Sequence, residues 1–210
     1  MTQSLLILGA GGHGHVVADA ARAAGVGKIA FLDDEKIESR FAHFPVIGRL
    51  SDLSKFAREW RCGIAAVGDN RLRRDLLSAL LIAGYETPAV VHSAAVISPD
   101  AEVGHGVFAA AGCVVNIGTR LGEGAIVNTG ATIDHDCLIG DGVHVSPGAH
   151  LAGNVTVMKD AWIGIGASVR NGISIGERAM VGAGSAVIHD VEEGAAVVGI
   201  PARPLSNRQG

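Results

Sequence analysis

The sequence is poor in aromatic residues, in cysteine and in net charge, and it has no long apolar run. Phe, Trp and Tyr make up 4% of the 210 residues, which suits a narrow interior packed with Val, Ile and Ala. The formal net charge of −4 gives no reason to expect nucleic acid or an anionic membrane as a partner. No apolar segment approaches the roughly 18 residues of a membrane span. Leu5–Ala10 also lacks the basic flank of a signal peptide.

Glycine is abundant instead, with 30 residues, and a six-residue repeat runs from Val91 to about Glu192 without insertion or deletion. One register of the repeat carries a bulky aliphatic residue at every position except Ala109. A short, strict period over about half of a chain indicates a solenoid. The register consists of Val91, Ile97, Val103, Ala109, Val115, Leu121, Val127, Ile133, Ile139, Val145, Leu151, Val157, Ile163, Val169, Ile175, Val181 and Val187.

Two further positions of the six-residue unit define the shape of the solenoid. The fourth residue after each aliphatic one is compact, and Cys113 and Cys137 fill this position as core residues. We therefore expect no disulfides and a reduced, cytoplasmic protein. The third residue after each aliphatic one tolerates positive φ, because it is mostly Gly, Asp or Asn. Glycine occupies it at Gly106, Gly112, Gly118, Gly124, Gly130, Gly142, Gly148, Gly166, Gly172 and Gly184.

Each unit is expected to form one short strand, whose two core residues point inward, and one tight corner. Three corners and 18 residues per coil give a triangular prism of five to six coils. The pattern resembles the hexapeptide-repeat acyltransferases, which implies a left-handed parallel β-helix. A fold of this kind does not establish a function by itself, because many solenoids are scaffolds.

The first ninety residues instead alternate strands with helices. This order predicts a small parallel sheet in an α/β, Rossmann-like half-domain. We expect three parts: residues 1–88 as this domain, 89–192 as the all-β solenoid, and 193–210 as an irregular C-terminal cap or tail. The expected strands are Ser4–Leu8, Lys28–Leu32 and Gly63–Val67, and the expected helices are His13–Ala24, Ser51–Trp60 and Arg71–Ala83.

A glycine-rich turn, G-x-G-x-x-G, joins the first strand to its helix. Asp33 and Asp34 end the second strand about twenty residues later, which is the spacing of a dinucleotide-binding fingerprint. The domain holds only one mononucleotide-binding half, so a nucleoside diphosphate attached to another group fits better than NAD. The alternative is that the glycines serve only helix–strand packing. The turn contains Gly9, Gly11, Gly12, His13 and Gly14.

Three short motifs ahead of the solenoid extend the resemblance to the whole chain. They are GAGGHG at 9–14, FLDDEK at 31–36 and GDNR at 68–71. Together with the repeat they resemble the nucleotide-sugar N-acetyltransferases of 4-amino-sugar nucleotides, as in perosamine and bacillosamine pathways. A sister group O-acetylates sialic acid. The resemblance implies that the glycine-rich turn holds the diphosphate, that Asp33, Asp34 and Lys36 address base and ribose, and that Asn70 lines the sugar end.

One corner of the solenoid carries ionisable side chains where most corners have small residues. At this corner His135 stands between Asp134 and Asp136. An imidazole oriented by a carboxylate is a typical general base near neutral pH, and an amine must lose a proton as it attacks a thioester. The catalytic His-acid dipeptide of the resembled family coincides with His135–Asp136, although that family often has Glu at the second position.

The residues around this corner suggest how acetyl-CoA binds. Gly153 lies one coil after His135, and its missing side chain leaves room for a pantetheine arm. His144 is half a coil from His135 and points in another direction, so one site containing both needs a neighbouring subunit. The resemblance implies a homotrimer with acetyl-CoA between adjacent prisms. It places His144, Gly153 and Ile165 against acetyl-CoA and Asn128 near the sugar or the acetyl oxygen.

The sequence thus predicts an acetyl-CoA-dependent N-acetyltransferase acting on a UDP- or GDP-linked 4-amino-4,6-dideoxy sugar. His135 and Asp136 are the catalytic residues, with no metal and no acyl-enzyme. Three alternatives stay open: a sialic acid O-acetyltransferase, a non-catalytic nucleotide-sugar sensor, and a zinc enzyme resembling γ-carbonic anhydrase. The zinc enzyme would need three converging histidines, and the His-x(4)-His spacing typical of it is absent.

Overall fold

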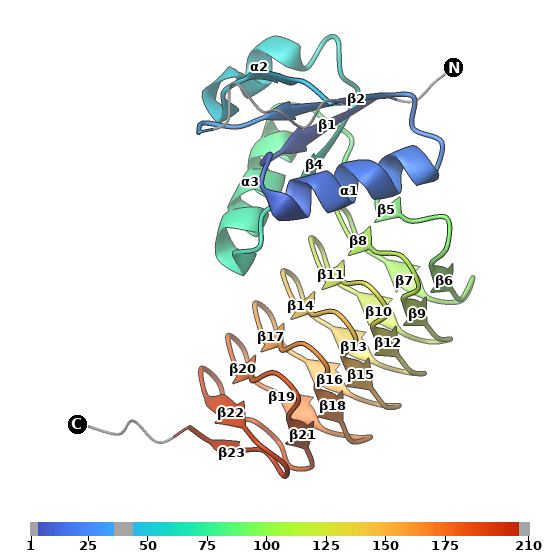
Figure 1. The fold of residues 1–210 in the computed structure, drawn as a ribbon, viewed down its shortest axis with the longest axis vertical. Helices are drawn as coiled ribbons and strands as arrows, with labels where there is room; N and C mark the ends of the chain where they lie inside the picture. The colour runs from blue at the N-terminus through green and yellow to red at the C-terminus, as the bar shows by residue number, and fades with distance from the viewer. Residues whose placement is uncertain (1–3, 36–43, 206–210) are drawn as a thin grey trace, which may run out of the picture.

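The chain folds into an α/β part that sits on one face of a prismatic solenoid (Figure 1). The computed structural model describes residues 4–35 and 44–205. The α/β part is Rossmann-like, and the solenoid is a left-handed parallel β-helix, so the predicted fold class is confirmed.

The α/β part contains one parallel sheet with the strand order β3-β2-β1-β4. Its strands and helices follow the alternation expected from the sequence, with two differences. The strand Val46–Gly48 had no clear sequence signal, and the expected helix Ser51–Trp60 is reduced to a 3-10 turn and one short helix. The elements are β1 (Ser4–Leu8), α1 (Gly12–Ala23), β2 (Lys28–Leu32), β3 (Val46–Gly48), η1 (Leu50–Asp52), α2 (Leu53–Phe56), β4 (Cys62–Ala65) and α3 (Asn70–Ile82).

Helix α1 is buried between this sheet and the solenoid. Val17 and Ala21 of α1 join one apolar cluster with Ile7 of β1 and with Phe108 and Ile126 of the solenoid. The opposite face of the sheet packs against α2 and α3 in a separate cluster. The first turn of α1 therefore lies at the junction of the two parts of the molecule.

The solenoid has three sheets, which we name after their first strands. Each coil contributes one two-residue strand to each sheet, in the register predicted by the six-residue repeat. The β5 sheet contains β5 (Val90–Val91), β8 (Phe108–Ala109), β11 (Ile126–Val127), β14 (His144–Val145), β17 (Trp162–Ile163), β20 (Met180–Val181), β22 (Ala196–Val198) and β23 (Arg203–Pro204).

The other two sheets are built in the same way. The β6 sheet contains β6 (Val96–Ile97), β9 (Val114–Val115), β12 (Thr132–Ile133), β15 (His150–Leu151), β18 (Ser168–Val169) and β21 (Ala186–Val187). The β7 sheet contains β7 (Glu102–Val103), β10 (Arg120–Leu121), β13 (Leu138–Ile139), β16 (Thr156–Val157) and β19 (Ser174–Ile175).

The corners have the backbone conformation predicted from their glycines. All ten corner glycines of the repeat have positive φ, and so do Asp136, Asn154 and Asp160. Arg178 also adopts positive φ, which its residue type did not predict. Inside the prism, Cys113 and Cys137 are buried as free thiols among aliphatic residues, so their predicted core role is confirmed.

The repeat continues further than the sequence suggested. Strand β22 pairs in parallel with β20, and β23 folds back antiparallel on β22. The expected irregular cap after Gly194 is therefore partly a continuation of the β5 sheet. The reason is that its inward residue Val197 is still apolar and buried, although the spacing of six residues is lost.

Helix α3 fixes the α/β part to the corners between the β7 and β5 sheets. Leu77 packs against Gly106 and Gly124, and Arg73 donates hydrogen bonds to the carbonyl oxygens of Gly124 and Gly142. In the described part of the chain, no helix is long and apolar enough to cross a membrane.

Candidate active site

His135 stands at the corner between β12 and β13, on an exposed edge of the prism. Its Nδ1 lies 2.8 Å from Oδ2 of Asp136, and about half of its side chain is exposed. A carboxylate only accepts hydrogen bonds, so Nδ1 carries the proton in the neutral ring and Nε2 keeps its lone pair. Asp136 thus reaches the imidazole despite being one methylene shorter than Glu.

The hydrogen bond to Asp136 also sets the proton affinity of the ring. It raises the pKa of His135 above the ordinary 6.5, with smaller contributions from the charges of Asp134 and Asp136. Because its pKa is raised, His135 loses its proton at higher pH than an ordinary histidine, and its neutral ring is a stronger base.

The preceding coil holds the corner in place. Asp134 Oδ1 accepts hydrogen bonds from Nδ2 of Asn116, at 2.8 Å, and from the main-chain N–H of His135, at 2.9 Å. These two hydrogen bonds lower the pKa of Asp134. The hydroxyl of Thr119 donates to the carbonyl oxygen of Asp134 at 2.7 Å. Asn116 and Thr119 were not predicted from the sequence, although each lies one coil before a residue of this corner.

A second His-Asp pair shows that the sequence motif alone is not enough. His189 and Asp190 lie on the same edge of the prism three coils later, at a corner that is two residues shorter, because Val191 rather than Glu193 pairs with Ile175. There, Asp190 accepts a hydrogen bond from the main-chain N–H of Ser174, and its backbone is not left-handed. At the corner of His135, by contrast, the carboxylate of Asp136 pairs with the imidazole ring.

Gly153 lies directly against the His135 ring. A Cβ on Gly153 would come within 2.4 Å of His135 Nε2 and 2.5 Å of Cε1. The space that the sequence assigned to a pantetheine arm is therefore filled by the imidazole itself. The contact of Gly153 with acetyl-CoA stays a prediction, and it would have to be made by the main chain.

In the glycine-rich turn, two glycines are packed too tightly for a side chain and two have space for one. A Cβ on Gly14 would lie 2.0 Å from the carbonyl oxygen of Gly9, and one on Gly9 would lie 2.8 Å from Val67. Gly11 and Gly12 have no atom within 4 Å of such a Cβ. Gly11 is the N-cap of α1 and provides no side-chain hydrogen bond, so the N–H groups of the first turn have no side-chain cap from this residue.

The two acidic residues after β2 accept hydrogen bonds from main-chain N–H groups. Asp33 accepts hydrogen bonds from the N–H groups of Ala10, at 2.7 Å, and Glu35. Asp34 accepts one from Leu50 at 3.0 Å. Asp33 thereby ties the end of β2 to the glycine-rich turn. Lys36 lies outside the described residues.

Asn70 is buried where α3 meets the solenoid. Its Nδ2 donates to the carbonyl oxygens of Asp160 and Ala161, and its Oδ1 accepts from Arg73. The predicted contact of Asn70 with a sugar would compete with these hydrogen bonds. Its role there stays a prediction, while its present contacts serve domain docking.

The structure brings together His13 and His144, which the sequence had assigned to different ligands. Their ring centroids are 6.3 Å apart at the junction between α1 and β14, and His144 also contacts Trp162. Burial and the nearby charge of Arg73 lower the pKa of His13 to about 4 and that of His144 to about 3. Both rings are therefore neutral at physiological pH.

Asn128 lies beside His144 rather than beside His135. The N–H of Thr129 donates to Oδ1 of Asn128, so its Nδ2 faces Nε2 of His144, at 3.1 Å. His144 is consequently protonated on Nδ1, which is buried without a hydrogen bond of ordinary geometry. Such a group is a ready donor for an acceptor that enters the junction.

The three residues predicted for acetyl-CoA do not converge within one chain. His144 lies on the β5 sheet, Gly153 at the corner that follows the β6 sheet, and Ile165 at the corner before it. Ile165 is exposed, whereas His144 is buried under the α/β part.

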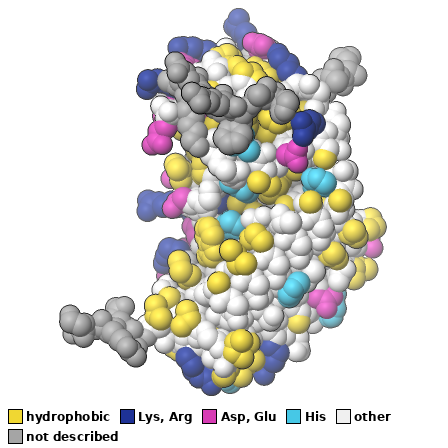
Figure 2. Space-filling view, in the orientation of Figure 1, with side chains coloured by type: hydrophobic (Ala, Val, Ile, Leu, Met, Phe, Trp, Pro, Cys, Tyr) yellow, Lys and Arg dark blue, Asp and Glu magenta, His cyan; other side chains and the backbone are white. Residues whose placement is uncertain are grey.

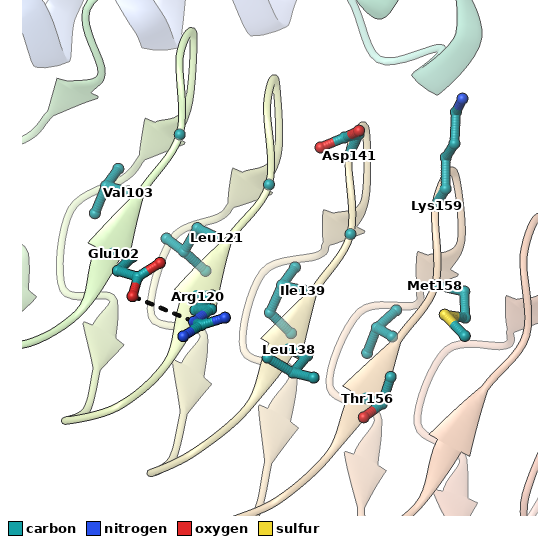
Figure 3. Close-up of a pocket in the computed structure, with 14 residues that line it drawn as sticks. Glu102, Val103, Arg120, Leu121, Leu138, Ile139, Asp141, Thr156, Met158 and Lys159 are labelled. Carbon is teal, nitrogen blue, oxygen red and sulfur yellow. Dashed lines mark ion pairs between the residues drawn. The ribbon is translucent and has the colours of Figure 1, made fainter.

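A broad groove along the β7 sheet is not this site. It is lined by Leu138, Met158, Lys159 and the exposed ion pair of Glu102 with Arg120 (Figure 3). None of the residues predicted for catalysis or binding lines it. Within residues 4–35 and 44–205, no three His, Cys, Asp or Glu side chains are grouped to hold a metal ion.

Comparison with known proteins identifies the class and then the family. Residues 4–80 match the PglD N-terminal domain family. No curated protein matches the chain. The acetyltransferase domain of PglB from Neisseria gonorrhoeae FA1090, in complex with acetyl coenzyme A, is 42% identical. The alignment covers 98% of this chain and 100% of that chain, with a TM-score of 0.94.

Two further solved structures agree over almost the whole chain. A histidine variant of perosamine N-acetyltransferase from Caulobacter crescentus, in complex with CoA and GDP-perosamine, is 34% identical. That alignment covers 99% of each chain, with a TM-score of 0.94. WeeI from Acinetobacter baumannii AYE is 30% identical, with 97% of this chain and 100% of that chain covered and a TM-score of 0.88.

The fold and its match to solved acetyltransferases over almost the whole chain define an acetyltransferase of the hexapeptide-repeat class. Within that class, the chain belongs to the nucleotide-sugar N-acetyltransferase family. The predicted family and enzyme class are confirmed.

Proposed function

We propose that this enzyme transfers the acetyl group of acetyl-CoA to the amine of a UDP- or GDP-linked 4-amino-4,6-dideoxy sugar. His135 is the general base and Asp136 orients it. One observation carries the proposal: Asp136 occupies Nδ1 of His135, so the exposed ring presents Nε2 as the atom that accepts a proton. The relatives bound to acetyl coenzyme A, or to CoA and GDP-perosamine, support the two substrates.

The nucleotide end of the substrate is proposed to lie at the first turn of α1. The open space beside Gly11 and Gly12, together with the N–H groups of that turn, suits a diphosphate. His13 belongs to the same turn, and Asp33 contacts the turn through the N–H group of Ala10. Asp34 and Lys36 follow Asp33 closely in the sequence. The domain assignment follows: residues 1–88 bind the nucleotide, 89–192 carry the transfer chemistry, and 193–210 form a cap and tail.

The reaction is proposed to be direct. The neutral amine attacks the thioester carbonyl carbon, the new C–N bond forms, and His135 Nε2 takes the proton lost by the amine. The C–S bond then breaks, and the thiolate of CoA takes up a proton. The carboxylate of Asp136 stabilises the imidazolium, and main-chain N–H groups near the corner stabilise the oxyanion. Cys62, Cys113 and Cys137 are all buried, which supports a route without an acyl-enzyme.

We infer that the active site is shared between subunits of a homotrimer. The α/β part packs on the first coils of the β5 sheet, around Phe108, Ile126 and His144, and the corner of His135 joins the β6 and β7 sheets. In a triangular prism this corner is opposite the β5 sheet. A site that contains both His144 and His135 therefore needs a second copy, which would bring its His135 to the edge of the junction that holds His144 and His13.

The surface of the solenoid supports such an assembly. Apolar side chains are exposed on the face of the solenoid seen in Figure 2. The large exposed apolar residues of the solenoid include Leu138, Met158, Ile165 and Met180. Leu138 and Met158 lie side by side along the β7 sheet, and a contiguous apolar surface of this kind favours association. The free cysteines also support a cytoplasmic location, where thiols stay reduced.

A thiol-release assay tests the proposed activity. With acetyl-CoA and a panel of UDP- and GDP-linked aminosugars, His135→Ala should lower kcat by on the order of 10²–10⁴. His189→Ala is the control, because His189 is an exposed histidine on the same edge of the prism, and the carboxylate of its neighbour Asp190 binds the main chain of Ser174. Nearly unchanged turnover of His135→Ala would assign the deprotonation to another group or to water.

A further inference from the structure

Two glycines flank the His135–Asp136 pair, one in each neighbouring coil. Gly118 lies one coil before Asp136, and a Cβ there would come within 2.5 Å of Oδ1 of Asp136. Gly153 lies one coil after His135, and a Cβ there would come within 2.4 Å of its Nε2. Real Cβ atoms essentially never make contacts this short. Both members of the pair therefore rest on backbone that has no side chain.

The same arrangement occurs at another corner with a different partner. A Cβ on Gly142 would lie 2.5 Å from Oδ1 of Asp160, which follows it by one coil. Asp160 has φ 59 and Asp136 has φ 56. The carboxylate of Asp160 pairs with Arg74, whereas that of Asp136 pairs with His135.

A third corner lacks this contact. The coil after Gly172 is two residues shorter there, because Val191 rather than Glu193 pairs with Ile175, and Asp190 does not have positive φ. A Cβ on Gly172 would accordingly meet nothing within 4 Å. At the two corners where the contact occurs, a left-handed Asp bends its carboxylate back over the glycine of the preceding coil. The glycine is needed wherever this happens.

We propose that Gly118 and Gly153 are positioning residues of the active site. The absence of their side chains forms a slot that keeps the carboxylate of Asp136 and the imidazole of His135 in hydrogen-bonding contact. This inference rests on the proposed function of His135 as the base. It goes further because it assigns the geometry of the pair to two glycines, which have no side-chain functional group.

The two atoms that would be displaced belong to exposed side chains, so substitution should move the pair rather than unfold the coil. Within this chain, the charges that act on His135 come from Asp134 and Asp136 at its own corner. The adjacent coils present the uncharged Asn116, Gly118 and Gly153. Loss of the Asp136 contact should therefore be visible as a fall in the pKa of His135.

The test compares Gly118→Ala with Gly172→Ala. Both glycines occupy the same corner, with φ +72 and +71, so both substitutions introduce the same left-handed strain. The titration of His135 is followed by proton NMR of the free enzyme, with the resonance assigned by its loss in His135→Ala. Thiol release gives kcat and KM for the same variants.

Gly118→Ala should lower the pKa of His135 and reduce kcat by about 10²-fold, with little change in KM, because the base is misplaced. Gly172→Ala should match the wild-type enzyme in both measurements. Equal pKa values and equal kcat in the two variants would overturn the inference. A lowered pKa with undiminished kcat would confirm the slot and instead overturn His135 as the base.

Gly153→Ala serves as the second variant, because Gly153 has no positive φ and the substitution adds no backbone strain. It should produce the same fall in kcat even if Gly118→Ala fails to fold. Wild-type kcat in a folded Gly153→Ala enzyme would contradict the proposed slot.

Discussion

At the scale of single residues, the proposed function depends on which residue occupies the left-handed position of a corner. Most corners of this solenoid have glycine at that position, but the corner after β12 has Asp136. The left-handed backbone of Asp136 turns its carboxylate towards Nδ1 of His135. The sequence predicted this pair because it interrupts a regular pattern. His189 and Asp190 share the same residue types but do not form this contact, because their corner is two residues shorter and Asp190 does not adopt the left-handed conformation.

The pH dependence of the reaction tests the role of Asp136. Its hydrogen bond raises the pKa of His135 above 6.5, so kcat/KM should rise with pH and reach half its plateau above pH 6.5. Asp136→Asn should shift this midpoint to lower pH, because the proton on the ring loses its partner. The plateau should also fall, by at most about 10⁴-fold, since the base loses its orientation.

Asp134→Asn is the comparison for that profile. Asp134 acts on His135 only through its charge and a main-chain hydrogen bond, so this variant should shift the midpoint less than Asp136→Asn. Identical pH profiles for Asp136→Asn and the wild-type enzyme would exclude Asp136 as the partner of the base.

At the scale of elements, α3 is the part of the fold that joins the two halves. Asn70, Arg73, Leu77 and Leu80 are buried along one stripe of the helix. Arg73 is 1% exposed, and its guanidinium donates only to main-chain and amide oxygens, among them the carbonyl oxygens of Gly124 and Gly142. Burial lowers its pKa to about 10, so it remains charged.

The docking role of Arg73 can be measured by unfolding. Arg73→Met leaves several buried carbonyl oxygens without a donor and should reduce the free energy of unfolding by at least about 3 kcal/mol. Trp60 reports on the α/β part and Trp162 on the solenoid, so urea titrations of Trp60→Phe and Trp162→Phe backgrounds follow each part separately. The α/β part should unfold at lower urea concentration in Arg73→Met.

Arg71→Met, on the exposed side of the same helix, should stay within about 0.5 kcal/mol of the wild-type protein. Equal losses in Arg71→Met and Arg73→Met would argue against a specific docking contact.

The sequence predicted α3 from its apolar spacing but gave Arg73 no role. A charged residue on the apolar stripe was the available signal, because Arg73 shares the spacing of Leu77 and Leu80. Its partners were not predictable, because they are main-chain carbonyl oxygens whose positions follow from coil stacking. The short strand β3 was missed for a similar reason, since three residues carry too little periodicity to indicate a strand.

At the scale of the whole molecule, the three sheets separate the two parts of the proposed site. The position proposed for the nucleotide lies over the first coils of the β5 sheet, and His135 lies at the opposite corner of the prism. The regular repeat made the prism and its coil arithmetic predictable from the sequence. The position of the α/β part over the β5 sheet was not predictable, because it depends on packing between α1 and residues such as Phe108 that the repeat treats as outward.

Mixing two inactive variants tests whether sites are shared. His135→Ala lacks the base, and Gly11→Asp places a carboxylate in the open space proposed for the diphosphate. Trimers refolded from an equal mixture should recover about one quarter of the wild-type rate, because one in four random pairings completes a shared site. No recovery, despite trimers of both chains by mass measurement, would place each site within a single chain.

The way α3 meets the prism keeps the α/β part in register with the coils. Leu77, Arg73 and Asn70 follow one another at three to four residues, and they meet corners of successive coils. Three residues of helix rise about 4.5 Å, close to the roughly 4.8 Å between adjacent strands, so each step along this face of the helix matches one coil of the prism. A displacement of the α/β part along the prism axis would therefore have to be one whole coil for these contacts to form again.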